Sequence, residues 1–196
     1  MPMKNAPLRY GAVAMTLHWI IAALILLNIY LGLSFDDIPR GPQLLAAIQL
    51  HESVGLTVLW LSVLRVVWRL VNPVPPLPAS MPRLLKGAAH VSHFLLYLLI
   101  LIVPLSGWIF ASASLRGLAI RYFGVFAWPF FPGFSGLDIP TKRQMHELFE
   151  SVHVTLAWSL IVLLVVHVSA ALYHQFWRKD EVLLRMIPGT KVKEPA

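Results

Sequence analysis

The chain alternates between long apolar stretches and short polar connections. Each of four stretches is long enough for a helix that crosses a bilayer, which needs about 20 apolar residues. They lie at about residues 12–35, 50–70, 88–111 and 148–177. Asp36, Asp37 and Pro39 end the first stretch, and the segment NPVPPLPASMP, which cannot continue a helix, follows the second. The pattern predicts an all-α integral membrane four-helix bundle, formed by residues 1–196 as one domain.

Two connecting segments have a pattern of their own. The sequence QLLAAIQ, ahead of the second stretch, predicts a short amphipathic piece. The longest loop, residues 112–146, carries Trp128, Phe130 and Phe131 among prolines at its centre. Aromatic side chains concentrate at the boundary between membrane and water. We therefore expect this loop to lie at the membrane surface, with His146 as an interfacial residue within it.

Composition limits the chemistry. Apolar residues make up 58% of the 196 and charged residues 13%, and the mean hydropathy is +0.71. A soluble domain is about half apolar and a quarter charged, so composition also indicates a membrane protein. The chain has no cysteine, which excludes disulfides, cysteine-ligated iron–sulfur clusters and covalently attached haem. Any haem would be held by coordination and packing alone.

The net charge of +7 is explained by membrane topology and does not indicate a nucleic-acid partner. Most of the 16 lysines and arginines flank the N-terminus, the second connection and the C-terminal tail. Because cytoplasmic loops carry the excess of these residues, both termini are predicted to lie in the cytoplasm. The first stretch lacks the pattern of a cleaved signal peptide and is expected to be retained as a span.

The fourth stretch carries His153, His167 and His174, at spacings of 14 and 7 residues. These spacings return each ring to nearly the same helix face, and 14 residues rise about 21 Å. Polar side chains inside a membrane usually face a bundle interior or a functional site. Two stacked imidazoles with partners on other helices are what two haem groups would need, since imidazole is a common axial ligand.

Depth in the membrane restricts which histidines can meet. With both termini inside, His51 and His153 open the second and fourth stretches at the outer surface, so they can share one metal ion. His18 and His167 lie at overlapping depths nearer the inner surface and can share a second. The sequence therefore predicts two bis-histidine sites stacked in the bundle, a usual place for a cofactor pocket.

Other interpretations remain open from the residues alone. His90 and His93, in the first turn of the third stretch, could compete for the inner site. A single histidine near the end of a span is also common as an interfacial residue without a ligand role. Zinc is the rival metal, although structural zinc sites prefer cysteine-rich tetrahedral ligand sets.

Several segments resemble the bacterial cytochrome b561 family of four-helix dihaem membrane cytochromes, which includes superoxide oxidase. The matching segments are TLHW at His18, QLHESVG at His51, RVVWRLVNPVPP, GAAHVSHFLLYLLILIVPLSG, and VHVTLAWSLIVLLVVHVSAALYHQFWRKDEVLLRMIPG. The resemblance covers nearly the whole chain except the outer loop from about Ser112 to Lys142. It implies two haem b groups, with His18 and His167 ligating the inner haem iron and His51 and His153 the outer one.

The resemblance also implies an activity. A family member of this kind is a multi-pass protein of the bacterial inner membrane that oxidises superoxide at the periplasmic face and reduces ubiquinone. Electrons would pass by an outer-sphere route, so no side chain is expected to act as a catalytic residue. His174, seven residues after His167, occupies the place of the family's histidine that helps form the quinone site. The alternative interpretation of His174 is a histidine at the membrane–water interface without such a role.

Arg65 and Arg69, at the end of the second stretch, have two interpretations. Guanidinium groups bind carboxylates bidentately, so they could pair with haem propionates. They could equally be cytoplasmic topology anchors. On the outer side acidic residues slightly outnumber basic ones, so the sequence predicts no clearly positive face that would attract superoxide.

Two further functions fit the pattern. The first is a cytochrome b anchor subunit that relays electrons between a partner dehydrogenase or hydrogenase and the quinone pool, with the aromatic outer loop as a docking surface. The second is a haem carrier, which predicts an open axial position on the iron.

Overall fold

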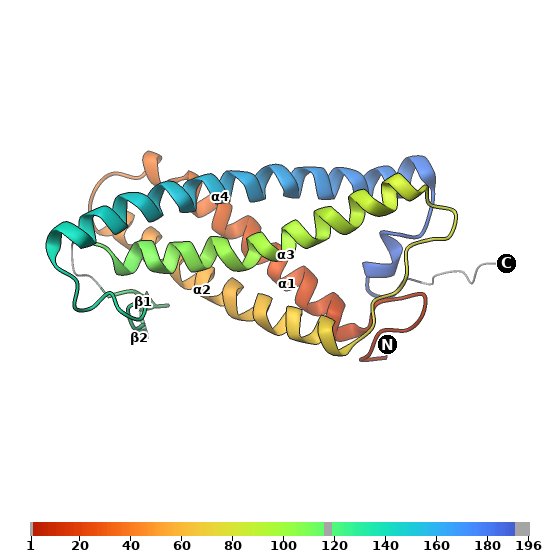
Figure 1. Cartoon of the computed structure of the whole chain (residues 1–196), viewed down its shortest axis with the longest axis horizontal. Coiled ribbons are helices and arrows are strands. Elements are labelled where there is room, and N and C mark those ends of the chain that lie inside the picture. The colour runs from red at the N-terminus through yellow and green to blue at the C-terminus, as the bar shows by residue number, and fades with distance from the viewer. Residues whose placement is uncertain (1, 116–118, 191–196) are drawn as a thin grey trace.

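Four long helices form the architecture of the computed structural model, which describes residues 2–115 and 119–190. They are α1 (Ala12–Leu33), α2 (Pro42–Val71), α3 (Arg83–Ser112) and α4 (Ile139–Tyr173). Each is long and apolar enough to cross a membrane. They run alternately up and down along the long axis of the molecule (Figure 1). The predicted all-α membrane bundle is confirmed.

Helices α2 and α4 extend beyond the apolar stretches of the sequence. The amphipathic piece QLLAAIQ is not separate, because α2 runs unbroken from Pro42. Helix α4 begins at Ile139, with Pro140 in its first turn, where a proline costs no hydrogen bond. His146 therefore lies on α4 and not in the outer loop, which corrects the sequence-based placement. A helix needs apolar residues to cross a bilayer but not to continue into water. Hydropathy alone therefore misses the first turns of α2 and α4, which lie outside the apolar stretches.

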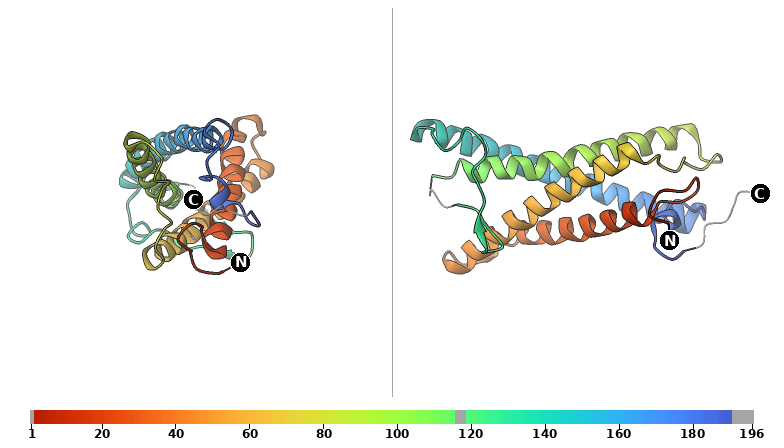
Figure 2. Two further views of the ribbon diagram at one scale, coloured as in Figure 1. Left: turned by 90° about the vertical axis from the view of Figure 1, so that its right-hand side faces the viewer. Right: turned by 90° about the horizontal axis from the view of Figure 1, so that it is seen from below.

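The bundle packs in chain order, α1 against α2, α2 against α3 and α3 against α4. Figure 2 shows the helices end-on around a common centre. One buried cluster fills the middle of the bundle and consists of Ile21, Ile25, Val58, Ile100 and Leu160. Leu160 lies midway between His153 and His167 along α4. An apolar layer thus separates the depths at which the two predicted histidine sites lie.

The two ends of the bundle differ. We call the end where α1 begins and α4 ends the terminal end, and the opposite end, which holds the α1–α2 and α3–α4 connections, the loop end (Figure 1). At the terminal end a π-helical turn, η2 (His174–Arg178), and a 3₁₀ turn, η3 (Leu184–Met186), follow α4. The indole of Trp19 donates a hydrogen bond to the Met186 carbonyl at 2.9 Å, which ties the tail to α1.

At the loop end, the 3₁₀ turn η1 (Phe35–Asp37) follows α1. The α3–α4 connection contains an antiparallel hairpin of strands β1 (Arg121–Tyr122) and β2 (Phe126–Ala127). This hairpin packs against α2. Hydropathy gave no signal for it, because strands of two residues are too short to show an alternating pattern.

Candidate functional site

His51 on α2 and His153 on α4 form an outer pair at the loop end. Their ring centroids are 6.2 Å apart and the ring planes are inclined by 85°. His51 Nδ1 lies 3.1 Å from the Asn28 carbonyl oxygen, and His153 Nδ1 lies 3.0 Å from that of Val103. A carbonyl only accepts, so in each ring Nδ1 carries the proton and Nε2 keeps its lone pair. This is the tautomer that a metal-ligating histidine needs.

Two glycines make room for these rings. A Cβ atom at Gly107 would lie 3.0 Å from Cε1 of His153, and one at Gly32 would lie 3.3 Å from Cε1 of His51. Both distances are tighter than ordinary van der Waals contact. Each outer ring therefore depends on a glycine in the neighbouring helix. Sequence reasoning missed these positions, and their only signal was a glycine inside an apolar helix.

The spacing of the outer pair fits a shared metal ion. Two metal–nitrogen bonds of about 2 Å each, plus half of each ring, place the centroids about 6 Å apart. Edge-to-face packing of two rings alone covers a similar range, so distance by itself does not separate the two arrangements. The fixed Nδ1 protons and the opposing glycines favour a shared metal ion, because edge-to-face packing alone would require neither of them. The residues therefore fit haem ligation.

The inner pair consists of His18 on α1 and His167 on α4. Their ring centroids are 6.3 Å apart, close to the outer value. A third ring, His93 on α3, lies 5.7 Å from that of His167, whereas His90 is exposed. Trp19 packs edge-on against His18 at 5.1 Å. The structure thus brings together the two rings that depth assigns to the inner site, with His93 as an additional neighbour.

The described residues do not favour zinc. Among them, no group of three or more histidine, aspartate or glutamate side chains is placed to hold a metal ion. Structural zinc sites use four ligands and catalytic sites use three. Pairs of imidazoles suit an iron whose other four ligands come from a macrocycle.

A cavity of about 660 Å³ opens at the loop end beside the outer pair. This volume is typical of a small-molecule or cofactor site. Phe35, one of its lining residues, packs edge-on against His51 with the ring centroids 5.4 Å apart. The charged residues that line it are Asp36, Arg40 and Glu150. Phe35 is the contact between this cavity and the outer pair, and the charge of the lining is mixed.

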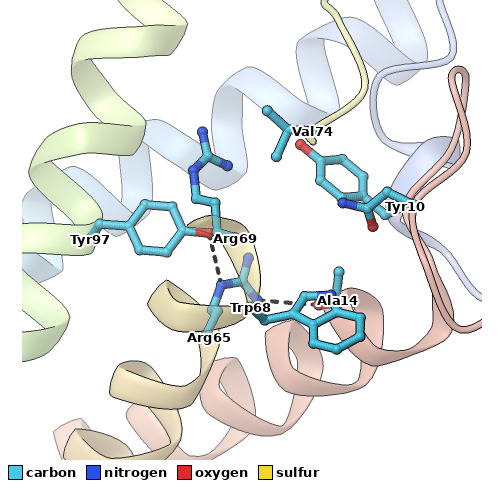
Figure 3. Close-up of a pocket in the computed structure, with 8 residues that line it drawn as sticks. Tyr10, Ala14, Arg65, Trp68, Arg69, Val74 and Tyr97 are labelled. Carbon is cyan, nitrogen blue, oxygen red and sulfur yellow. Dashed lines mark hydrogen bonds between the residues drawn. The ribbon is translucent and has the colours of Figure 1, made fainter. Parts of the chain in front are cut away.

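Arg65 and Arg69 gather around one tyrosine near the inner pair (Figure 3). The Arg65 Nε atom donates to the Tyr97 hydroxyl at 3.2 Å. The two guanidinium carbons lie 5.6 and 5.0 Å from the Tyr97 ring centroid. Burial raises the pKa of Tyr10, which lines the same pocket, and the positive charge of Arg69 opposes that rise. Among the described residues no carboxylate pairs with either arginine.

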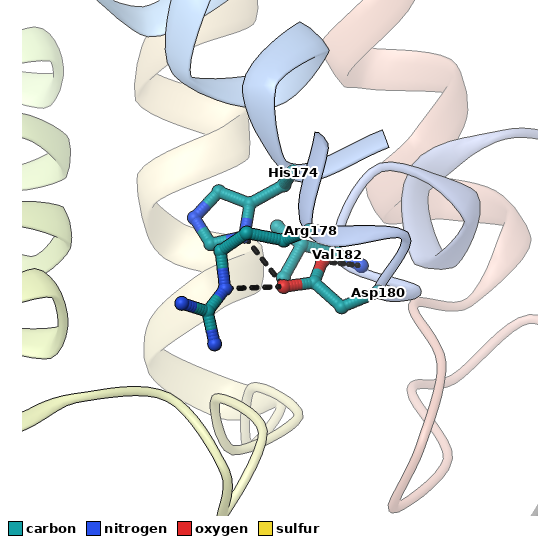
Figure 4. Close-up of polar contacts among 4 residues, drawn as sticks. All are labelled: His174, Arg178, Asp180 and Val182. Atoms are coloured by element: carbon teal, nitrogen blue, oxygen red, sulfur yellow. Dashed lines mark hydrogen bonds and ion pairs between the residues drawn. The ribbon is translucent and has the colours of Figure 1, made fainter. Parts of the chain in front are cut away.

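His174 is buried, with 8% of its surface exposed. Its Nδ1 lies 2.6 Å from Oδ2 of Asp180, and Arg178 Nε lies 3.6 Å from the same oxygen (Figure 4). The turn that brings Asp180 back passes through Lys179 in the left-handed region, at φ 52°. The ring is therefore held by a carboxylate and is not an exposed interfacial histidine. Sequence reasoning missed Asp180, because only the π-helical turn brings it beside the ring.

His146 has a different environment from the paired histidines. Its ring lies against Phe110, with centroids 4.5 Å apart and planes inclined by 32°. In the described part of the chain, Phe110 is the aromatic side chain that packs against it.

Paired imidazoles at two depths of a transmembrane bundle, with an apolar layer between them, define a membrane cytochrome of the b type. Comparison with known proteins agrees. The profile of the prokaryotic cytochrome b561 family matches residues 9–189, and the chain belongs to this family. It is a bacterial membrane electron-transfer protein that binds haem b.

The chain is similar along most of its length to three further proteins. Cytochrome b561 homolog 2 of Escherichia coli (strain K12) is 33% identical over 195 residues, which cover 95% of each chain. Cytochrome b562 of Cereibacter sphaeroides is 32% identical over 183 residues, covering 91% of this chain and 94% of the relative. The probable superoxide oxidase CybB of Yersinia pestis is 28% identical over 185 residues, covering 92% and 96%.

Proposed function

We propose that this protein binds two haem b groups and carries electrons from superoxide at the loop end to ubiquinone at the terminal end. The loop end would face the periplasm and the terminal end the cytoplasm of a bacterial inner membrane. The observation that carries the proposal is the pair of histidine sites stacked on either side of the apolar layer. Haem b, when bound, supplies one-electron chemistry.

Each haem would have its own ligands. His51 and His153 would hold the outer haem, supported by the backbone carbonyls of Asn28 and Val103, which fix both Nδ1 protons. His18 and His167 would hold the inner haem. Two imidazoles would then hold each iron, and this would distinguish the protein from a haem carrier.

Two arginines support the inner site. Arg65 and Arg69 have no carboxylate partner among the described residues. Uncompensated guanidinium groups near the inner pair suit the propionates of a haem, since bidentate pairing with carboxylate is their strongest contact. Their position at the terminal end also keeps them consistent with a role as cytoplasmic topology anchors.

The quinone headgroup would bind at the terminal end, beside His174. Asp180 accepts the Nδ1–H of this ring, so Nε2 is the atom left for a quinone oxygen. A hydrogen on Nε2 would let the ring donate a hydrogen bond to that oxygen. Reduction of one ubiquinone by two superoxide ions yields two O₂ and one quinol, and it consumes two protons.

Stopped-flow mixing of the purified, oxidised holoprotein with superoxide tests the proposal. We expect reduction of the b-type absorbance band, followed by reoxidation when a short-chain ubiquinone is added. The control is the same mixture with superoxide dismutase, which removes the donor. A holoprotein whose spectrum changes no more than this control would rule out superoxide as the donor.

A relay from a partner dehydrogenase or hydrogenase is the second candidate. The outer cavity favours it, because Asp36 and Glu150 face the same space as Arg40 and weaken any attraction for an anion. Superoxide reactivity has its support in the relative named probable superoxide oxidase. Mild solubilisation and affinity purification distinguish the two, since a stoichiometric redox subunit would accompany an anchor.

A further inference from the structure

The outer connection contains an uncharged segment from Tyr122 to Leu137. Its aromatic residues are Tyr122, Phe123, Phe126, Trp128, Phe130, Phe131 and Phe134. A loop that lies wholly in water would normally mix charged and polar residues. Aromatic side chains without charges are typical of protein that contacts the membrane interface. The hairpin β1–β2 forms the first part of this segment.

Two hydrogen bonds hold the hairpin against the side of α2. The Tyr122 hydroxyl lies 2.9 Å from Oγ1 of Thr57. The backbone N–H of Phe123 donates to Oγ of Ser53 at 2.9 Å, while the Ser53 hydroxyl donates to the Gln49 carbonyl at 2.7 Å and lies 3.3 Å from the Arg121 carbonyl. Thr57 lies six residues beyond His51 along α2, about 9 Å closer to the middle of the bundle. The hairpin is therefore at the depth of the membrane span, not beyond it.

The tip of the hairpin is apolar and exposed. Val125 is 77% exposed, Phe123 50% and Phe126 48%. Figure 1 shows the hairpin beside α2, outside the bundle. On α2, Trp60 follows Thr57 by three residues and is 49% exposed. Exposed apolar side chains at the depth of a span are the ones that a bilayer covers.

The backbone N–H groups of the tip have hydrogen-bond partners within the protein, as an apolar environment requires. Phe123 and Gly124 both have positive φ, at 48° and 73°, as a tight hairpin turn of the primed type requires. The N–H groups of Gly124 and Val125 donate to the carbonyls of Arg121 and Tyr122, at 3.1 and 3.0 Å. With Phe123 N–H bound to Ser53, the donors of the turn are satisfied. Such a turn can enter the interface without leaving unpaired N–H groups among lipids.

We infer that the β1–β2 hairpin inserts its tip, Phe123–Phe126, into the bilayer at the loop end, between headgroups and acyl chains. Lipid on one side and α2 on the other hold the hairpin in place. Because Ser53 and Thr57 lie two and six residues beyond His51 on the same helix, this contact also steadies the segment of α2 that carries an outer-pair histidine. The inference rests on the membrane bundle and not on the proposed electron donor.

The absence of cysteine permits a direct test with single-cysteine variants. A nitroxide label is attached to Val125→Cys, in phosphatidylcholine liposomes, and its collision rates with oxygen and with a water-soluble nickel chelate are measured. The matched control is Asp138→Cys, an exposed, charged position in the same connection, just beyond the uncharged segment. We expect the oxygen-to-nickel ratio at position 125 to exceed that at position 138 several-fold.

Two outcomes would overturn the inference. Equal ratios at the two positions would place the tip in water. Low collision rates with both reagents at position 125, or line broadening between labels, would show that a protein surface covers the tip, from a second copy or a partner subunit.

Trypsin cleavage gives a second readout. Val125→Asp places a charge on the tip, which is costly among lipids, whereas Val125→Leu keeps it apolar. We expect cleavage after Arg121 in liposomes to be several-fold faster in the aspartate variant than in the leucine variant. Equal cleavage rates in the two variants would contradict insertion.

Discussion

The outer and inner histidine pairs have nearly the same spacing but different support. At the outer rings, backbone carbonyls accept from both Nδ1 atoms and glycines face the rings, and Phe35 and the Ser106 hydroxyl are the side chains beside them. The inner rings lie among side chains, with His93 and Trp19 against them and Arg65 close enough to act on both rings electrostatically. The difference suggests a division of roles, with rigid geometry at the outer pair and positive charge at the inner pair.

Under the proposed function, this difference would give electron transfer a direction. Positive charge near a redox centre stabilises an added electron and raises its reduction potential. The inner haem would therefore attract electrons from the outer one, towards the end of the bundle that carries His174. The outer cavity, with Asp36 and Glu150 beside Arg40, offers no comparable excess of positive charge.

Removing an outer ligand is expected to have the largest effect. His153→Ala should lower the haem content from about two to about one per chain, because an unliganded haem is not retained by packing alone. Pyridine haemochrome analysis measures the ratio. His146→Ala, on the same helix but outside both pairs, is the control and should leave the ratio unchanged. A full haem complement in the His153 variant would contradict the pairing.

The next largest effect is expected at the terminal end. His174→Ala should keep both haems but slow reoxidation by ubiquinone by about a hundredfold, the usual contribution of a positioned proton donor. Asp180→Asn should act in the same direction but less strongly, because the amide oxygen can still accept from Nδ1. Stopped-flow reoxidation of the reduced holoprotein measures both variants. Normal turnover in the His174 variant would remove this residue from the quinone site.

The sequence predicted the pairs better than it predicted what supports them. Hydropathy and helical rise placed His51 with His153 and His18 with His167, because depth follows from counting residues along each span. The hydrogen-bond acceptors of the outer rings are backbone carbonyls. Every residue type has one, so the sequence does not indicate which carbonyl will accept. The glycines facing the rings depend on how helices cross, and the position of Asp180 depends on a π-helical turn. These features arise only when the chain is folded.

A smaller effect is expected from adding one methyl group at the outer pair. In Gly107→Ala the new Cβ would lie 3.0 Å from His153, so the ring must shift. We expect the outer haem site to lose about 1 to 2 kcal/mol, the cost of slight overpacking. Thermal release of haem, followed by absorbance, measures it. Gly87→Ala on the same helix, where nothing lies within 4 Å of the new Cβ, is the control. Equal release temperatures in the two variants would show that the ring needs no glycine.

The smallest effect is expected from removing one charge near the inner pair. Arg65→Gln keeps a donor for the Tyr97 hydroxyl but removes a positive charge, so the inner haem should become harder to reduce. One charge at about 10 Å in a medium of effective dielectric 20 shifts a potential by on the order of 50 mV. A spectroscopic redox titration resolves the two haems, and the outer potential should move less because it is farther away. Arg83→Gln, at the start of α3 and outside the inner pocket, controls for net charge. Equal shifts of the two potentials in both variants would show that Arg65 has no particular effect on the reduction potential at the inner pair. The proposed electrostatic difference between the two pairs would then be wrong.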